Sequence, residues 1–120
     1  NAHSMHTHGT STPVGDSKAL EAIRTVFGSK EFGKIPAIAS TKSLTGHALG
    51  AAGSNEAVYS LIMMNEGFLG ASVNIDEKDP AGKGLPILTE KKEQEVITSM
   101  SNSFGFGGVN ASLVFSKAKL

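Results

Sequence analysis

Apolar and polar positions alternate with different periods along the chain, and these periods predict its elements. Leu20, Ile23 and Phe27 are three and four residues apart, which is the spacing of one face of an α-helix. Asp16, or its neighbour Ser17, is a residue type that caps helices and is expected to begin this one. A first amphipathic helix is therefore predicted in the first quarter of the chain, with Gly28 as its natural end.

A longer apolar stretch over residues 47–65 predicts a second, central helix. Thr45 is expected as its N-cap, which would place His47 in the first turn, and Gly67 is expected to end it. The stretch is apolar almost all round, so the helix should be buried on several sides. One of its faces is expected to meet the rest of the domain and another to meet a further layer.

Glu56 is the exception within this apolar stretch. At helical spacing it shares a stripe with Ala52, Tyr59 and Met63. A carboxylate on a buried stripe needs a partner, and Lys42 is the candidate. The alternative is an exposed glutamate on the rim of the helix.

Shorter apolar runs bounded by turn residues predict strands. They cover residues 36–40, 68–74, 86–89, 96–103 and 110–116. Between them, residues 76–84 are polar and contain glycine and proline, and residues 91–95 are a charge run, so both are expected to be solvated. The order of helices and strands indicates an α/β layer structure.

Composition and charge narrow the function classes. The 120 residues carry 11 basic and 11 acidic side chains and no cysteine. Zero net charge favours neither a nucleic acid nor an anionic membrane as partner. No apolar run approaches the roughly 20 residues of a transmembrane helix, and the lack of cysteine fits a cytoplasmic protein.

The first five residues lead into nothing periodic and do not begin with methionine. They are therefore interpreted as a non-native remnant, and the domain is expected to span residues 6–120. His3, His6 and His8 have no neighbouring carboxylate or cysteine, so no metal site is expected there.

The candidate chemistry begins in residues 40–53, which read Ser-Thr-Lys-Ser-Leu-Thr-Gly-His-Ala-Leu-Gly-Ala-Ala-Gly. Lys42 and His47 are polar groups placed where the central helix is predicted to begin. The positive end of a helix disfavours an imidazolium, and a neutral imidazole can donate its N–H to a developing oxyanion. The alternative is a tight turn with a capping histidine.

Two further blocks accompany this one. They are His-Gly-Thr-Ser-Thr-Pro-Val-Gly-Asp at 8–16 and Ser-Asn-Ser-Phe-Gly-Phe-Gly-Gly-Val-Asn at 101–110. Together the three blocks resemble the β-ketoacyl-acyl carrier protein synthases, the condensing enzymes of fatty acid synthesis, from about His8 to the C-terminus. The resemblance implies the C-terminal half of a thiolase-like fold, in which a mixed five-stranded sheet packs against helices.

The resemblance also implies catalytic roles. His8 and His47 would donate their ring N–H groups to the malonyl thioester carbonyl and stabilise the enolate that forms on loss of carbon dioxide. Lys42 resembles the active-site lysine that orients this network, and Glu56 resembles the glutamate that pairs with that lysine through water. A thioester oxygen that gains negative charge needs preorganised donors of this kind.

Two other groups of residues would contact substrate by the same resemblance. Thr10 and Thr12 match positions that bind the phosphopantetheine arm of the acyl carrier protein, although a turn that bonds its own backbone is an equal alternative. In the loop Phe104-Gly105-Phe106-Gly107, Phe106 would give a backbone N–H to the oxyanion hole, and both aromatic rings would gate the site. The alternative is a glycine-rich turn between strands with two core aromatics. Side-chain hydrogen bonds from Asn102 and Asn110 to the backbone are expected to pin this loop.

The chain departs from the family at two places. The family's nucleophilic cysteine lies in its N-terminal half, so this chain alone is expected to be inactive. His6 and Thr7 stand where the family commonly has asparagine and a small residue. The expected partners are the N-terminal half of the same enzyme, acyl carrier protein and a second copy in a homodimer, with no tightly bound cofactor.

Rival interpretations remain at this point. A thiolase would bring a second active-site cysteine from this half, whereas this chain has no cysteine. An initiating synthase has asparagine where one of the two histidines stands, so an elongating synthase fits this chain better. A non-catalytic thiolase-fold binding or partner module and a polyketide-type condensing domain stay open as alternatives. A nucleotide-binding loop lacks both of its motifs here.

Overall fold

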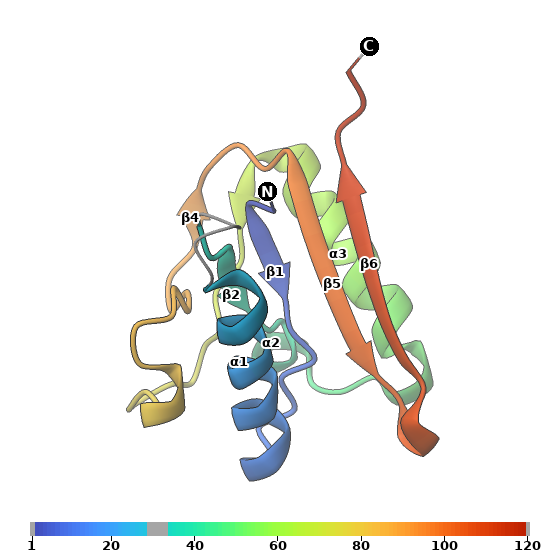
Figure 1. The fold of residues 1–120 in the computed structure, drawn as a ribbon. Coiled ribbons are helices and arrows are strands. Elements are labelled where there is room, and N and C mark those ends of the chain that lie inside the picture. The colour runs from blue at the N-terminus through green and yellow to red at the C-terminus, as the bar shows by residue number, and fades with distance from the viewer. Residues whose placement is uncertain (1, 29–33, 120) are drawn as a thin grey trace.

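The computed structural model describes residues 2–28 and 34–119 (Figure 1). The helices are α1 (Pro13–Phe27), α2 (Lys42–Thr45) and α3 (Ala52–Glu66). The strands are β1 (Ser4–His6), β2 (Ala37–Ala39), β3 (Phe68–Leu69), β4 (Lys92–Glu93), β5 (Thr98–Phe104) and β6 (Asn110–Ser116). Single 3-10 turns lie at Leu49–Ala51, Pro80–Gly82 and Phe106–Gly108.

The main sheet has the strand order β2-β1-β5-β6 and is mixed, as predicted. β1 runs parallel to both β2 and β5, whereas β5 and β6 form an antiparallel hairpin. Four strands therefore form the sheet, and beyond β2 a single parallel bridge between Ile38 and Ile87 takes the fifth position. Among the described residues, no helix is long and apolar enough to cross a membrane.

β1 begins before residue 6, the expected start of the domain. Ser4 and Met5 were assigned to an unstructured remnant, yet they belong to a strand that lies between β2 and β5. Met5 is buried in the core with Ile23 and Ile38. The prediction missed the strand because three residues are too few to show a period of two.

α1 covers one face of the sheet (Figure 1). Its predicted apolar stripe is confirmed, since Leu20, Ile23 and Phe27 all belong to the cluster around Met5. The predicted cap is wrong. The helix begins at Pro13, and the Thr12 hydroxyl accepts the N–H of Gly15, because proline suits a first helical position that needs no donor.

The entry to α3 also differs from the prediction. Thr45 is the last residue of α2 rather than a cap, and Gly46, with a φ of 75°, turns the chain away. His47 therefore lies in a loop before the 3-10 turn, and α3 begins only at Ala52. The glycines of this stretch break the helix that the apolar pattern alone would extend to residue 47. The predicted end at Gly67 is confirmed.

α3 packs against the other face of the sheet and buries one stripe of it, which consists of Ala52, Glu56, Ser60 and Met64. Met64 joins Leu69 and Val96 in a second core cluster. The opposite side of the helix stays exposed in this chain, at Val58, Leu61 and Ile62. Burial on several sides is thus not seen within the described residues.

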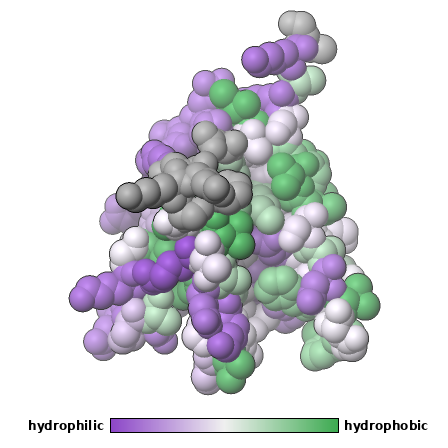
Figure 2. Space-filling model, in the orientation of Figure 1, coloured by the Kyte–Doolittle hydropathy of each residue, from purple (hydrophilic) through white to green (hydrophobic). Residues whose placement is uncertain are grey.

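The sheet itself also leaves apolar surface open. Figure 2 shows hydrophobic residues over the β5 and β6 side of the sheet, which α1 does not cover. Leu113 and Val114 of β6 are both exposed, although they point to opposite faces of the strand. Within the described residues, neither face of β6 is therefore buried.

The segment after α3 is less regular than predicted. Only Phe68 and Leu69 form a strand, and they pair with β4 in a separate two-stranded sheet. Residues 72–73 are extended and are held by backbone and side chains together. The Ser72 N–H donates to the Leu88 carbonyl at 2.9 Å, Ser72 Oγ accepts from the Ser40 N–H, and Ser43 Oγ accepts from the Val73 N–H.

Candidate active site

Lys42 and Glu56 form an ion pair inside the protein. α2 supplies the lysine and α3 the glutamate, and their residues are only 8% and 3% exposed. The predicted pairing is confirmed, and the exposed-rim alternative for Glu56 is wrong. The lysine ammonium contacts Glu56 Oε1 directly, whereas the resemblance implied a bridging water.

His6 is a third member of this buried cluster, and the sequence reasoning assigned it no role. It lies on β1 and is 3% exposed. The Thr41 N–H donates to its Nε2 at 2.9 Å, and its Nδ1 lies 4.0 Å from Glu56 Oε2. Burial, helped by the positive charge of Lys42, lowers the pKa of His6 to about 4. The sequence signal at this position is that His6 stands where the family commonly has asparagine.

The two histidines predicted to be catalytic lie together. The His8 and His47 rings are 5.5 Å apart between centroids and nearly perpendicular. His8 also stacks at 5.5 Å with Phe104, which is 96 positions away in the sequence. Three segments that the sequence analysis singled out therefore meet at one place.

Both histidines use Nδ1 as a hydrogen-bond acceptor. His8 Nδ1 accepts the N–H of Phe104 at 3.3 Å, and His47 Nδ1 accepts the N–H of Leu49 at 3.0 Å. A neutral imidazole that accepts at one nitrogen carries its proton on the other. Each ring thus holds its N–H at Nε2. His47 makes this bond within a loop and not at the start of a helix, where the sequence predicted it.

The pKa of His8 is lowered from its ordinary value. Burial is the largest cause, the positive charge of Lys42 and the neighbouring His47 act in the same direction, and Asp16 opposes them. The neutral form of His8 is therefore favoured near neutral pH. This effect links the Lys42–Glu56 pair to the histidine pair electrostatically.

Thr10 and Thr12 stand at the start of α1. Thr12 caps the helix, and the Thr10 hydroxyl donates to the Thr12 hydroxyl at 3.4 Å. The structure thus shows the local turn that was the alternative for Thr12. Both threonines also line a pocket of about 740 Å³, which reaches Lys42 and His47.

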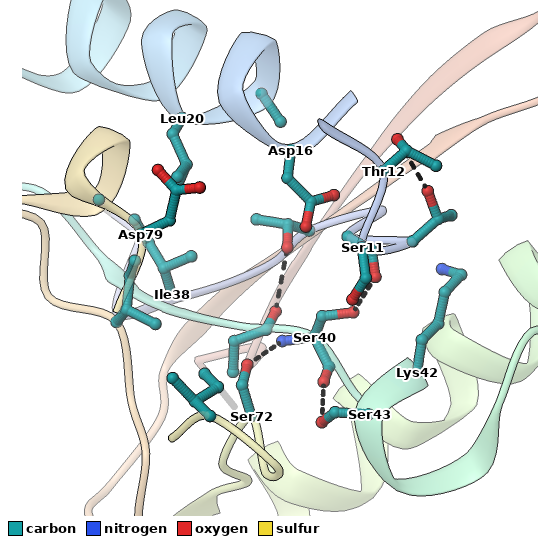
Figure 3. Close-up of a pocket in the computed structure, with 18 of the residues that line it drawn as sticks. Ser11, Thr12, Asp16, Leu20, Ile38, Ser40, Lys42, Ser43, Ser72 and Asp79 are labelled. Carbon is teal, nitrogen blue, oxygen red and sulfur yellow. Dashed lines mark hydrogen bonds between the residues drawn. The ribbon is translucent and has the colours of Figure 1, made fainter. Parts of the chain in front are cut away.

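Figure 3 shows the polar wall of this pocket. Ser40, Ser43 and Ser72 come from two chain segments and are joined through hydrogen bonds to backbone groups. Asp16 and Asp79 lie on the α1 side of the same space, and Lys42 lies on the α2 side. The pocket is open enough and polar enough to admit a chain-like ligand with hydrogen-bonding groups.

The glycine-rich loop is the turn of the β5–β6 hairpin. Gly107 and Gly108 have φ values of 80° and 84°, which other residues adopt only with strain. The Gly105 N–H donates to the Val109 carbonyl at 2.7 Å and closes the turn. The Phe106 side chain is 94% exposed at its tip. Within the described residues it packs on no core cluster, so the alternative of two core aromatics is wrong for Phe106.

Asn102 was expected to bond to the backbone and pin this loop. Instead its side-chain oxygen accepts the hydroxyl of Ser112 across the hairpin at 2.7 Å. The bond joins neighbouring strands above the turn. Among the described residues, no group of three or more histidine, cysteine, aspartate or glutamate side chains is placed to hold a metal ion.

Comparison with known proteins shows which family this chain resembles. Residues 3–76 match the family described as "Beta-ketoacyl synthase, C-terminal domain". The chain is 57% identical over 115 residues to 3-oxoacyl-[acyl-carrier-protein] synthase 1 of Escherichia coli, a match that covers 96% of this chain and 27% of the relative. The synthase of the same name from Haemophilus influenzae is 56% identical over 114 residues, with 94% and 27% covered. The chain thus spans about a quarter of these curated relatives.

Solved structures agree. A β-ketoacyl synthase from Burkholderia phymatum is 35% identical with a TM-score of 0.85, over 98% of this chain and 28% of that one. The ishigamide ketosynthase/chain length factor is 28% identical with a TM-score of 0.89 and the same coverage. The predicted thiolase-like α/β fold is confirmed. On the profile match and on both identities, the chain belongs to the β-ketoacyl synthase family and corresponds to its C-terminal domain.

Proposed function

We propose that this chain is the part of an elongating 3-oxoacyl-acyl carrier protein synthase that stabilises the malonyl-derived enolate. The observation that carries the proposal is the pair of histidines, His8 and His47, whose Nδ1 atoms each accept a backbone N–H. Both rings therefore keep an Nε2–H available for one ligand. Two neutral donors side by side suit a thioester oxygen that gains negative charge.

The reaction runs in balanced steps. The malonyl thioester loses carbon dioxide, and the electron pair of the broken C–C bond becomes the enolate, whose oxygen accepts from both Nε2–H groups. The enolate carbon then attacks an acyl thioester, and that thioester's sulfur leaves as a thiolate. The chain has no cysteine, so the acyl-bearing thiolate comes from another part of the enzyme and the chain alone is inactive.

The other predicted residues have supporting parts in this proposal. Burial lowers the pKa of His8, and the charge of Lys42, which is paired with Glu56, adds to that lowering and favours the neutral ring. The backbone N–H of Phe106 serves the oxyanion hole for the acyl thioester. Phe104 and Phe106, next to Gly105 and Gly107, gate the entrance.

Acyl carrier protein is the proposed donor of both thioesters, since the relatives are named as synthases that act on it. Its phosphopantetheine arm would lie along the pocket lined by Thr10 and Thr12, with no tightly bound cofactor. The exposed apolar residues of α3 support a partner in the remainder of the enzyme, the N-terminal half. The whole enzyme is proposed to be a cytoplasmic homodimer.

The identity level favours fatty acid synthesis over the polyketide alternative. The curated fatty acid synthases share 57% and 56% of residues with this chain. The ishigamide ketosynthase/chain length factor and a type II polyketide ketosynthase each share 28%. A non-catalytic partner module has less support, because both histidines and the Lys42–Glu56 pair are in place.

The test is malonyl-carrier decarboxylation by the full-length protein that contains this chain. His8→Ala and His47→Ala should each slow the reaction by about 10²- to 10³-fold, the usual effect of losing one oxyanion donor. His3→Ala is a matched control, because His3 Nδ1 also accepts backbone N–H groups, from Ile97 and Thr98, away from the site. Folded variants of His8 and His47 that keep full activity would overturn the proposal.

A further inference from the structure

His6 is a buried polar side chain whose hydrogen bonding is only half complete. Its Nε2 has Thr41 as partner, but its Nδ1 has none, and the same is true of Glu56 Oε2. Both residues are 3% exposed. Buried polar atoms without a partner are rare because each costs about 1–3 kcal/mol. These two atoms face each other across 4.0 Å.

The Thr41 backbone determines which His6 nitrogen carries the proton. An N–H of Thr41 donates to Nε2 at 2.9 Å, and the Thr41 hydroxyl lies 2.7 Å from the same atom. Nε2 must therefore be unprotonated, so the neutral ring has its N–H at Nδ1. A doubly protonated ring would set an Nε2–H against the Thr41 N–H. This is the opposite tautomer to that of His8 and His47.

The Glu56 carboxylate has one oxygen bound and one oxygen open. Lys42 contacts Oε1, and within the described part of the chain Oε2 has no donor. The ionisable side chains facing the cluster are Lys42 from α2, Glu56 from α3 and His6 from β1, with His8 two residues farther along. A carboxylate oxygen this deeply buried needs a hydrogen-bond donor.

We propose that His6 is a positioning residue, which donates its Nδ1–H to Glu56 Oε2 directly or through one buried water and so holds the Glu56 carboxylate in place against Lys42. The catalytic consequence of this inference rests on the proposed function, whereas the hydrogen bond between His6 and Glu56 does not depend on it. His6 touches neither substrate nor the reacting atoms in this scheme. It acts through Glu56, then Lys42, then His8.

The last step of this chain of effects is electrostatic. Burial lowers the pKa of His8, and the positive charge of Lys42 adds to that lowering. Without the second donor, the Glu56 carboxylate is free to turn, and Lys42, which it binds, is no longer held near His8. His8 then loses a neighbouring positive charge and becomes easier to protonate. A protonated His8 cannot accept the Phe104 N–H at Nδ1. As the pH falls, the site therefore loses this hydrogen bond at a higher pH than in the wild-type protein.

The catalytic test is the pH profile of malonyl-carrier decarboxylation by the full-length protein. His6→Leu removes the donor and should move the acid limb upward by roughly one pH unit, with KM little changed. His6→Asn, whose amide N–H can reach the same oxygen, should keep the limb near its wild-type position. Ser4→Ala is the control, because Ser4 is buried on the same strand but bonds to Ser99.

An unmoved acid limb in His6→Leu, or an equal shift in His6→Asn, would overturn the proposal.

A second measurement needs no variant to fold. In ¹⁵N-histidine-labelled full-length protein, NMR should show His6 as the Nδ1–H tautomer from pH 6 to 8. An Nε2–H tautomer, or a ring that is protonated in that range, overturns it. If the wild-type protein does not decarboxylate malonyl-carrier, the proposed function is wrong. The NMR measurement of the tautomer then tests the His6 proposal by itself.

Discussion

Two regions of this chain, a buried polar cluster and an exposed hairpin tip, differ in how completely the chain itself encloses them. The cluster of His6, Lys42 and Glu56 is packed between the sheet, α2 and α3, and no member is more than 8% exposed. At the tip of the β5–β6 hairpin, by contrast, the Phe106 side chain is 94% exposed. The groups that orient charge are thus held inside, whereas the groups proposed to meet substrate are presented outward.

The difference separates stability from recognition. Breaking a buried polar cluster leaves a charge that neither water nor protein compensates, so the fold loses stability. Changing an exposed tip leaves the interior as it was, so any effect should appear in activity. This contrast can be tested region by region.

The largest expected effect comes from separating the buried ion pair. Glu56→Leu leaves the Lys42 ammonium buried without its carboxylate and should cost about 3–5 kcal/mol of unfolding free energy. Urea denaturation of the full-length protein measures it. The matched control is Lys18→Met, which breaks the exposed pair with Glu21 on α1 and should not change the midpoint. Equal effects of the two variants would contradict the contrast drawn here.

Acid should weaken the fold through the same cluster. The pKa of His6 is lowered to about 4 from 6.5, so between these values the unfolded chain binds a proton that the folded chain does not. Stability therefore falls as pH drops through this window, with a His6 contribution of about 1.4 kcal/mol per pH unit. Below pH 4 that contribution stops growing.

The measurement is the unfolding free energy at several pH values for wild type and His6→Asn. Asparagine does not titrate, so the difference in slope isolates His6. His8, whose pKa is also lowered, contributes in the same direction in both proteins and cancels. Parallel slopes for the two proteins would show that His6 titrates at its ordinary pKa.

The sequence predicted the parts of this molecule that depend on the spacing of apolar residues or on the pairing of opposite charges. The stripe of α1 and the partner of Glu56 both followed from spacing and from the cost of a lone buried carboxylate. The thiolase-like fold and the three motif blocks followed from the resemblance to the family. These features are local or are carried by recognisable residues.

The rest depended on contacts between distant segments. β1 is too short to show a pattern, and its position is fixed by parallel pairing with residues more than 30 and 90 positions away. His47 was placed in a helix because glycine positions 46 and 50 were given less weight than apolar content. The Nδ1 bond from Phe104 to His8 spans 96 positions, so no sequence window contains both.

At the exposed tip, backbone conformation should matter more than side-chain packing. Gly107 has a φ of 80°, and a Cβ added there would meet open space. Gly107→Ala therefore introduces no clash and costs only the left-handed conformation, about 1–2 kcal/mol. Thermal unfolding of the full-length protein measures the cost, and Ala111→Gly, in the adjoining strand, controls for a simple glycine–alanine difference. A neutral Gly107→Ala would mean that the turn relaxes to another conformation.

Phe106→Ala should have the smallest effect on stability. The side chain is 94% exposed, so the unfolding free energy should stay within about 0.5 kcal/mol of wild type. The backbone N–H proposed for the oxyanion hole remains in alanine, so acyl transfer should slow by less than the hundredfold expected from losing a donor. Stopped-flow acylation of the full-length protein separates the two roles. A small loss with altered acyl-chain preference fits a gating ring, whereas a loss above a hundredfold would show that the ring, and not only the backbone, stabilises the transition state.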